Sequence, residues 1–252
     1  MKFIAIIPAR YASSRFPGKP LAKLGGVEMI VRVCRRAAES GIECAVATDD
    51  ERIFQCVEQA GFRAVMTSES CGSGTERVEE AYRNLGCDAD VVINIQGDEP
   101  FIRPEQIRKL MEIFEQYPDT RLATLIKSYP ASGGIAGLED PNLVKVTVAD
   151  NGDALYFSRS VIPYVRGVEK GYWLDTVDFH THIGIYAYRA ETLKEIVALP
   201  VSSLERAESL EQLRWLQHGY SVKTALTEFD TIGIDTPADL EAAEKYLKEH
   251  FC

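Results

Sequence analysis

The sequence predicts an α/β fold built on a mostly parallel sheet. Three observations indicate this class: short apolar runs alternate with segments of helical periodicity, the runs are apolar on consecutive residues, and glycines stand where several helices are expected to end. With 252 residues, of which 46% are hydrophobic, the chain can bury a sizeable core in one α/β domain. This composition excludes a disordered or collagen-like chain.

The first half of the chain predicts a βαβαβ unit, which requires parallel strands. Residues 3–7 form a continuous apolar run, typical of a strand buried on both faces, and a polar loop follows at 9–25. Residues 27–39 carry apolar side chains at helical spacing and end near Gly41. The pattern continues with a strand at 44–48, a helix at 50–60, a strand at 62–66, a helix at 75–85 capped by Thr75, a strand at 91–95 and a helix at 104–117.

After about residue 120 the pattern changes. Asn151 and Gly152 are a turn signal between apolar runs at 144–149 and 154–157, which predicts a hairpin. The glycine-rich segment 131–142 is expected to be a surface loop. The remaining predictions are strands at 122–126, 182–188 and 221–228, helices at 190–198 and 204–217, and a terminal helix from Pro237 capped by Thr236 or Asp235.

Charge and cysteine content exclude several classes of protein. The chain has 28 Lys and Arg against 38 Asp and Glu, and its net charge of −10 argues against a general binder of nucleic acid. The six cysteines include no C-x-x-C pair, so we expect free thiols rather than a zinc site. The apolar run behind Lys2 is too short for a signal peptide or a membrane span. We therefore expect a cytoplasmic protein without a membrane partner.

A polar loop at 8–20 follows the first predicted strand and concentrates positive charge. Arg10, Arg15 and Lys19 lie within ten residues, at the carboxyl end of a strand, where open parallel sheets bind ligands. Such cations bind phosphate oxygens, and Ser13 adds a donor. The loop therefore indicates a polyphosphate site, although a solvated basic loop has the same composition. The motifs GxxxxGK[ST] and GxGxxG are absent, which weakens a kinase or dehydrogenase assignment.

Two distant aspartates are candidate metal ligands. Asp98 follows the buried strand at 91–95, and Asp235 follows a short apolar stretch far along the chain. Mg²⁺ takes one or two carboxylates and completes its coordination with phosphate and water. We therefore expect Asp98 and Asp235 to hold one Mg²⁺ together. Each has an ordinary alternative, since Asp98 can be a turn residue and Asp235 can cap the helix that follows it.

The segment SCGSGTERV at 70–78 combines glycines and hydroxyls at the start of a predicted helix. The free backbone N–H groups at such a start favour an anion or the carbonyl groups of a base. An ordinary capping box formed by Ser73 or Thr75 is the alternative.

Seven strings along the chain share their order and spacing with one enzyme family. They are IPARYASSRFPGKPL at 7–21, SGTERV at 73–78, NIQGDEPFI at 94–102, ALYFSRSVIP at 154–163, HIGIYAYR at 182–189, SLEQLRWL at 209–216 and IDTPADL at 234–240. Together they closely resemble the 3-deoxy-manno-octulosonate (Kdo) cytidylyltransferases over nearly the whole chain. The segments 131–138 and 166–179 match least.

This resemblance implies a nucleotide-diphosphosugar transferase fold, with a Rossmann-like mixed sheet, in a homodimer. It also implies an enzyme that uses CTP, Kdo and Mg²⁺ to make CMP-Kdo and pyrophosphate for lipopolysaccharide biosynthesis. We expect residues 1–252 to be a single catalytic domain. Within it, residues 1–118 would bind the nucleotide, 119–230 would bind the sugar and dimerise, and 231–252 would supply a metal ligand and the terminal helix.

The resemblance also implies a role for individual residues. Lys19, Arg15, Asp98 and Asp235 would be catalytic, with the metal on Asp98 and Asp235. The nucleotide would contact Arg10, Ser13, Arg15, Lys19, Ser73, Gly74, Arg77 and Gln96. The sugar would contact Arg159, His182, Tyr186, Glu211 and Gln212, with Arg159 and His182 suited to its carboxylate.

Each sugar-side residue has an alternative interpretation. Glu211 and Gln212 are also compatible with a solvated helix face, Tyr186 with a core position and His182 with a satisfied strand histidine, and His180 lies on the same face of that strand. Two other functions stay open. The chain could activate another acidic sugar, such as an 8-amino variant of Kdo or a sialic acid, or it could be a non-catalytic nucleotide-binding subunit.

Overall fold

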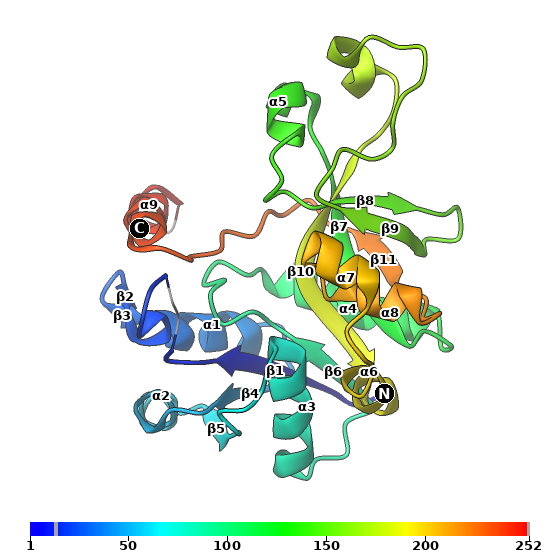
Figure 1. The fold of residues 1–252 in the computed structure, drawn as a ribbon. Coiled ribbons are helices and arrows are strands. Elements are labelled where there is room, and N and C mark those ends of the chain that lie inside the picture. The colour runs from blue at the N-terminus through cyan, green and yellow to red at the C-terminus, as the bar shows by residue number, and fades with distance from the viewer. Residues whose placement is uncertain (13–14, 251–252) are drawn as a thin grey trace. The chain divides into compact units, whose positions relative to one another are not determined.

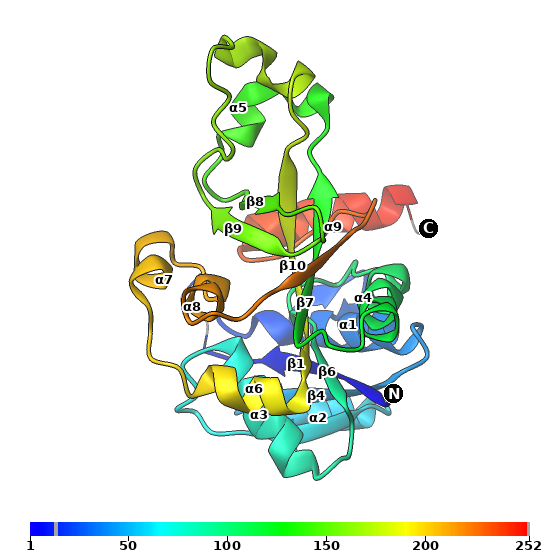
Figure 2. The same ribbon diagram turned by 90° about the vertical axis from the view of Figure 1, so that its right-hand side faces the viewer.

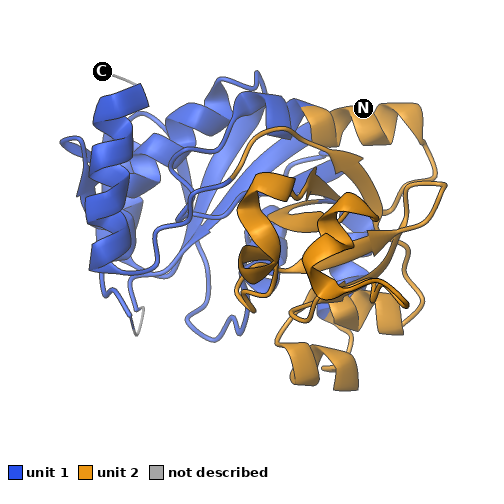
Figure 3. Ribbon diagram, turned by 90° about the horizontal axis from the view of Figure 1, so that it is seen from above, with its two compact units in different colours: residues 1–108, 187–197, 231–252 blue, residues 109–186, 198–230 orange. Residues whose placement is uncertain are grey.

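The computed structural model describes residues 1–12 and 15–250 of the chain. These residues form two compact units (Figure 3). Unit 1 contains residues 1–108, 187–197 and 231–252, and unit 2 contains residues 109–186 and 198–230. Each unit therefore collects segments that are far apart in the sequence.

Unit 1 is built on parallel strands in the order β6-β1-β4-β5, surrounded by helices (Figure 1). Its elements are β1 (Phe3–Ala9), a 3-10 helix η1 (Lys19–Leu21), β2 (Lys23–Leu24), β3 (Val27–Glu28), α1 (Met29–Ala38), β4 (Glu43–Thr48), α2 (Glu51–Gln59), β5 (Arg63–Met66), α3 (Gly74–Leu85), β6 (Val91–Asn94), α6 (Ala190–Val197) and α9 (Pro237–His250). The strand β1 lies between β4 and β6, and its residues Ile4 to Ile7 are fully buried. This confirms the predicted βαβαβ unit and the two-sided burial of its first strand.

Unit 2 mixes parallel and antiparallel pairs (Figure 2). Its elements are β7 (Leu122–Ser128), η2 (Ala131–Gly133), α5 (Gly134–Leu138), β8 (Lys145–Val148), β9 (Ala154–Ser158), η3 (Lys170–Asp175), α7 (Ser203–Glu208), α8 (Gln212–Gln217) and β11 (Lys223–Leu226), while α4 (Pro104–Gln116) and β10 (His180–Arg189) have residues in both units. The strands β11 and β7 are parallel, and β8 is antiparallel to β9 and β10. The hairpin predicted around Asn151 and Gly152 is confirmed as β8–β9.

Two local predictions in unit 2 are wrong. The helix expected at 204–217 is divided into α7 and α8, because Ser209 between them adopts a left-handed backbone with φ of 52°. The surface loop expected at 131–142 contains η2 and α5. Leu138 of α5 is buried in a small apolar cluster with Trp173 and Phe179. This tertiary packing stabilises a helix that the glycine-rich sequence alone does not favour.

The cysteine prediction holds for the residues that the structure describes. Cys34, Cys44, Cys56, Cys71 and Cys87 are all free thiols. Within the same residues, no helix has the length and apolar character needed to cross a bilayer.

Gly97 occupies the point where the chain leaving β6 passes beside the end of β1. A Cβ atom at this position would lie 2.6 Å from the backbone oxygen of Pro8, which is closer than real Cβ contacts allow. Only a residue without a side chain permits this approach. Gly97 thereby brings the residue that follows it, Asp98, next to the loop that follows β1.

We expect Gly97→Ala to lower the free energy of unfolding by about 1–3 kcal/mol, because the added methyl group overlaps rigid backbone. Gly233→Ala is the matched control in the same unit, since its Cβ would have no heavy atom within 4 Å. We expect the control to change stability by less than about 0.5 kcal/mol. Urea denaturation of both variants measures the difference, and equal midpoints would contradict the steric argument.

Candidate functional site

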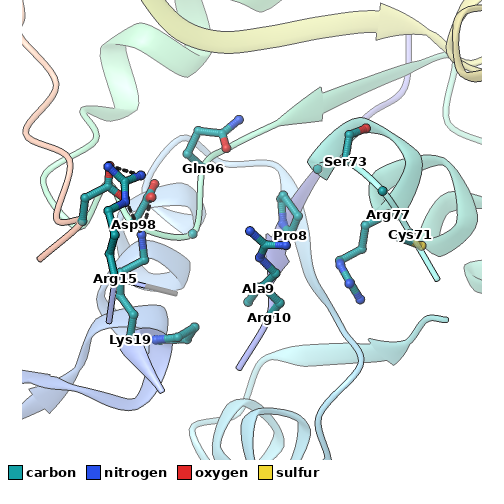
Figure 4. A pocket seen from close by; sticks show the side chains of 15 residues that line it. Pro8, Ala9, Arg10, Arg15, Lys19, Cys71, Ser73, Arg77, Gln96 and Asp98 are labelled. Atoms are coloured by element: carbon teal, nitrogen blue, oxygen red, sulfur yellow. Dashed lines mark hydrogen bonds and ion pairs between the residues drawn. The ribbon is translucent and has the colours of Figure 1, made fainter. Parts of the chain in front are cut away.

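A cavity of about 420 Å³ in unit 1 brings the predicted phosphate loop, metal ligands and glycine loop together (Figure 4). It is lined by Pro8, Ala9, Arg10, Arg15, Lys19, Pro20, Cys71, Gly72, Ser73, Gly74, Arg77, Gln96, Gly97, Asp98 and Asp235. They come from the end of β1 and the segment after it, from the loop before α3 and its first turn, from the segment after β6 and from the segment before α9. The cavity therefore gathers four segments that the sequence separates widely.

Lys19 is the centre of the charged side of this cavity. Its ammonium group donates to Asp98 Oδ2 at 2.6 Å and to Asp235 Oδ1 at 3.0 Å. Arg15 approaches the other oxygen of Asp235 at 3.1 Å. The Lys19 side chain is only 13% exposed, so its charge is poorly screened by water. The two aspartates of the metal prediction thus face a single cation position.

The start of α9 explains why Asp235 is available to the cavity. The hydroxyl of Thr236 accepts the backbone N–H of Asp239, and the Asp239 carboxylate accepts the backbone N–H groups of Asp235 and Thr236. The Thr236 hydroxyl also donates to the Asp239 carboxylate. This bond lowers the pKa of Asp239 most, and the two backbone N–H bonds lower it further. Of the two predicted caps, Thr236 is therefore the one used. The carboxylate of Asp235 is left to bind Lys19 and Arg15.

The pair Asp98 and Asp235 fits a hard divalent ion. Two carboxylates that converge on one cation position match what Mg²⁺ takes from a protein when phosphates and water complete its coordination. No group of three or more His, Cys, Asp or Glu side chains arranged for a metal occurs in the described part of the chain. The neighbouring Glu99 is buried, and this burial raises its pKa to about 8, so it adds little negative charge at neutral pH.

The glycine loop is held in place by α3. Ser73, not Thr75, caps this helix, because its hydroxyl accepts the backbone N–H of Glu76. The Glu76 carboxylate accepts the backbone N–H of Gly72 at 2.7 Å, and Glu80 accepts that of Ser68 at 2.9 Å. The loop that lines the cavity is therefore fixed by side chains one and two turns along the helix.

Arg77 also acts within this framework. Its guanidinium donates to Asp49 Oδ2 and to the hydroxyl of Thr67, both at 2.6 Å. The side chains of Arg77 and Asp49 are only 5% and 15% exposed. Arg77 lines the cavity as predicted, but its donors are directed toward β4 and the segment after β5. Direct recognition of a base by this guanidinium would require these bonds to open.

The other predicted nucleotide-binding residues differ in their surroundings. Arg10 is exposed at the cavity and has no ion-pair partner among residues 1–12 and 15–250. The amide of Gln96 donates to Asn94 Oδ1 at 3.4 Å and lies between Asp98 and the glycine loop (Figure 4). Gly74 is the first residue of α3. Ser13 lies outside the described residues.

The predicted sugar-binding residues all lie in unit 2. Arg159 is bound through its guanidinium to the backbone oxygens of Glu208 at 2.6 Å, Pro141 at 2.8 Å and Ser209 at 3.4 Å. These bonds join three chain segments. In this arrangement Arg159 acts as a link between loops, and a free carboxylate ligand would have to displace these backbone oxygens.

His182 is partly buried on β10 between two aromatic rings. Its ring centroid lies 5.1 Å from that of Phe157 and 5.2 Å from that of Tyr186, and Thr124 Oγ1 is 3.0 Å from its Nε2. Burial lowers the pKa of His182 to about 3, so the ring is neutral at physiological pH. Contact between His182 and the carboxylate of the sugar stays a prediction, and in this structure burial disfavours the charged imidazolium. Tyr186 is buried, as its core interpretation required.

Glu211 immediately precedes α8 and Gln212 is its first residue, and only Gln212 is well buried. Gln212 is 5% exposed, which contradicts a solvated helix face at this position. Glu211 is the N-terminal flanking residue of the helix and is partly exposed.

Sequence reasoning missed the residues that hold the site rather than line it. Asp49 and Thr67 fix Arg77, and Glu80 fixes Ser68 and Cys71. The signal for Asp49 was present, since it follows a buried strand at the same edge as Asp98. Glu80 shows no comparable signal, because a glutamate within a helix is usually solvated.

The family model described as cytidylyltransferase matches residues 4–225 of this chain. A 3-deoxy-manno-octulosonate cytidylyltransferase of Phocaeicola vulgatus is 55% identical over 249 residues, which cover 99% of this chain and 98% of that protein. An 8-amino-3,8-dideoxy-manno-octulosonate cytidylyltransferase of Shewanella sp. strain ANA-3 is 44% identical, over 98% of this chain and 99% of that protein. A solved CMP:2-keto-3-deoxy-manno-octonic acid synthetase complexed with CTP matches 100% of both chains, with a TM-score of 0.91 and 41% identity.

We expect Arg77→Met to lower the free energy of unfolding by about 3–5 kcal/mol, because it leaves the Asp49 carboxylate buried without its partner. Arg63→Met is the control, since Arg63 pairs with Glu43 at the surface of the same unit, where both side chains are about half exposed. Removing that pair should cost less than about 1 kcal/mol. Chemical denaturation distinguishes the two variants, and a small loss for Arg77→Met would show that Asp49 is not an obligatory partner.

Proposed function

The chain belongs to the cytidylyltransferase family, and among its members to the 3-deoxy-manno-octulosonate cytidylyltransferases, and we propose that it activates Kdo with CTP. The products would be CMP-Kdo and pyrophosphate. The observation that carries this proposal is the convergence of Lys19, Asp98 and Asp235 beside the cationic loop in one cavity. Two carboxylates and several cations are what a metal-dependent transfer from a nucleoside triphosphate requires.

The reaction would be an in-line displacement at the α-phosphorus of CTP. The anomeric 2-hydroxyl oxygen of Kdo forms the new bond to phosphorus, and the bond from phosphorus to the α–β bridging oxygen breaks. The hydroxyl proton is released, and pyrophosphate leaves with the bonding electron pair. Because negative charge grows on the bridging oxygen, positioning and electrostatic stabilisation would supply most of the acceleration.

The cations of the cavity would divide this work. Arg10 and Arg15 are exposed at the cavity and would bind phosphate oxygens. Lys19 has a flexible stem, so its ammonium could turn from the two carboxylates toward the leaving pyrophosphate. The backbone N–H groups at the start of α3, next to Gly74, would donate hydrogen bonds to polar groups of the cytidine.

Asp98 and Asp235 would hold the magnesium ion, because both carboxylates converge on the ammonium group of Lys19. When bound, Mg²⁺ would neutralise negative charge on phosphate oxygens and lower the proton affinity of a coordinated hydroxyl. The protein's own contribution is to bring the two carboxylates together. Thr236 supports this arrangement because it caps α9 in place of Asp235.

On the sugar side, we propose contacts from Arg159, His182, Tyr186, Glu211 and Gln212. The neutral His182 suits a hydroxyl of the sugar better than its carboxylate. A homodimer and a cytoplasmic location remain predictions from the resemblance, and light scattering of the purified protein would test the first of them.

The proposal is tested by incubating the purified protein with CTP, Mg²⁺ and one acidic sugar at a time, and by measuring pyrophosphate release. We expect Kdo to give the highest kcat/KM. The 8-amino variant of Kdo is the second candidate, because a relative named for that sugar is 44% identical. A preference for the 8-amino sugar or for sialic acid would change the substrate assignment, and no release with any sugar would contradict catalysis altogether.

We expect Asp98→Asn to reduce kcat by about 10²- to 10³-fold at saturating substrates, because it removes one charged ligand of the proposed metal site. Asp88→Asn is the control, since Asp88 is an exposed aspartate of the same unit that pairs only with Lys2 among the described residues. The control should retain wild-type turnover. Near-normal kcat of Asp98→Asn across a magnesium titration would remove Asp98 from the metal role.

We expect Lys19→Ala to lower kcat at saturating CTP more strongly than it raises the KM for CTP, because the proposed charge of Lys19 acts on the departing pyrophosphate. Lys23→Ala is the matched control, since Lys23 is an exposed lysine four residues away that pairs with Glu28. Steady-state kinetics of both variants separate the two parameters. An effect confined to KM would contradict the leaving-group assignment.

A further inference from the structure

The hydroxyl of Thr124 lies at the centre of a small hydrogen-bond network in unit 2. Thr124 is on β7 and is fully buried. Its Oγ1 is 2.8 Å from the backbone oxygen of Ile185, 3.1 Å from that of Ile183 and 3.0 Å from Nε2 of His182. All three partners belong to β10, so one hydroxyl connects β7 to the strand that carries the proposed sugar-binding histidine.

The chemistry of these partners decides the direction of each hydrogen bond. The two backbone oxygens can only accept, so the single hydroxyl hydrogen of Thr124 is directed toward them. The hydroxyl oxygen then has lone pairs to offer, and among its described neighbours only His182 can supply a hydrogen. The bond between Thr124 and His182 is therefore an Nε2–H donated to the hydroxyl oxygen.

The remaining ring nitrogen follows from this assignment. A neutral imidazole carries one hydrogen, so a hydrogen on Nε2 leaves Nδ1 as an acceptor. Among the residues that the structure describes, no hydrogen-bond partner of Nδ1 is present. The rings of Phe157 and Tyr186 pack against the imidazole and restrict its rotation. The orientation of the acceptor is therefore fixed by β7, β9 and β10 together.

We propose that Thr124 is a positioning residue that holds His182 in the neutral Nε2–H tautomer and leaves Nδ1 to accept a hydrogen bond from a hydroxyl group of the sugar. The Thr124–His182 part stands on geometry alone, and the sugar contact rests on the function proposed above. This assignment also accounts for a fully buried threonine where an apolar residue of similar shape would otherwise pack well.

The tautomer is measured directly by ¹⁵N NMR of the imidazole nitrogens in uniformly labelled full-length protein, without any substrate. The chain has four histidines, and the spectrum of His182→Asn assigns the signals of His182. At pH 7 we expect the signals of a single neutral tautomer with the hydrogen on Nε2. A hydrogen on Nδ1 or on both nitrogens would overturn the proposal.

Three variants then test the role of the hydroxyl. Thr124→Val keeps the shape but removes the oxygen, and we expect its His182 signals to show a mixture of tautomers and its KM for Kdo to rise about fivefold with little change in the KM for CTP. Thr124→Ser keeps the hydroxyl and should restore both readouts. Thr181→Val is the control. Thr181, on β10, is a buried threonine like Thr124, and its hydroxyl donates to the backbone oxygen of Lys127. It should leave the His182 tautomer unchanged.

The possible failures are distinguishable. A higher KM for Kdo in Thr124→Val with an unaltered tautomer would mean that the hydroxyl supports only the fold, and it would overturn the proposal. An unchanged tautomer with an unchanged KM would do the same. If the wild-type protein releases no pyrophosphate with Kdo, while its His182 is a single Nε2–H tautomer that Thr124→Val turns into a mixture, the proposed function fails and the positioning role of Thr124 stands.

Discussion

An ammonium group shared by two carboxylates connects the parts of unit 1 that carry the candidate chemistry. The carboxylates of Asp98 and Asp235 both lie within 3.0 Å of the Lys19 ammonium group. Their negative charges repel each other, and the positive charge of Lys19 offsets that repulsion. The surrounding structure serves this arrangement: Gly97 permits the close approach of two strand ends, and Thr236 caps α9 in place of Asp235. Two carboxylates that converge on one ammonium group favour positive charge between them, and this is the charge that Lys19 supplies.

The part of the site that follows buried strands could be predicted from the sequence. A strand that is apolar on consecutive residues delivers the next polar residue to the ligand-binding edge of a parallel sheet, and Asp98 and the cationic loop obeyed this rule. The choice between neighbouring caps could not be predicted. Ser73 and Thr75, or Asp235 and Thr236, have the same capping chemistry, and only the direction of the incoming chain decides which side chain turns toward the helix.

The sugar-side predictions depended on packing that no local pattern contains. The guanidinium of Arg159 donates to backbone oxygens that lie about 18 and 50 residues away in the sequence, and burial disfavours the charged form of His182. The left-handed backbone of Ser209 likewise divides a segment whose periodicity is helical throughout. For Arg159 and His182, the hydrogen bonds and the burial depend on residues far away in the sequence, so the local sequence could not predict them.

The return of residues 231–252 to unit 1 has a consequence for biosynthesis. Ribosomes add residues in order, so the strands and loops that hold Lys19 and Asp98 are complete long before Asp235 is added, 216 residues after Lys19. A nascent chain therefore carries Lys19 against a single carboxylate. The arrangement of two carboxylates around Lys19 is therefore completed only when the late segment docks.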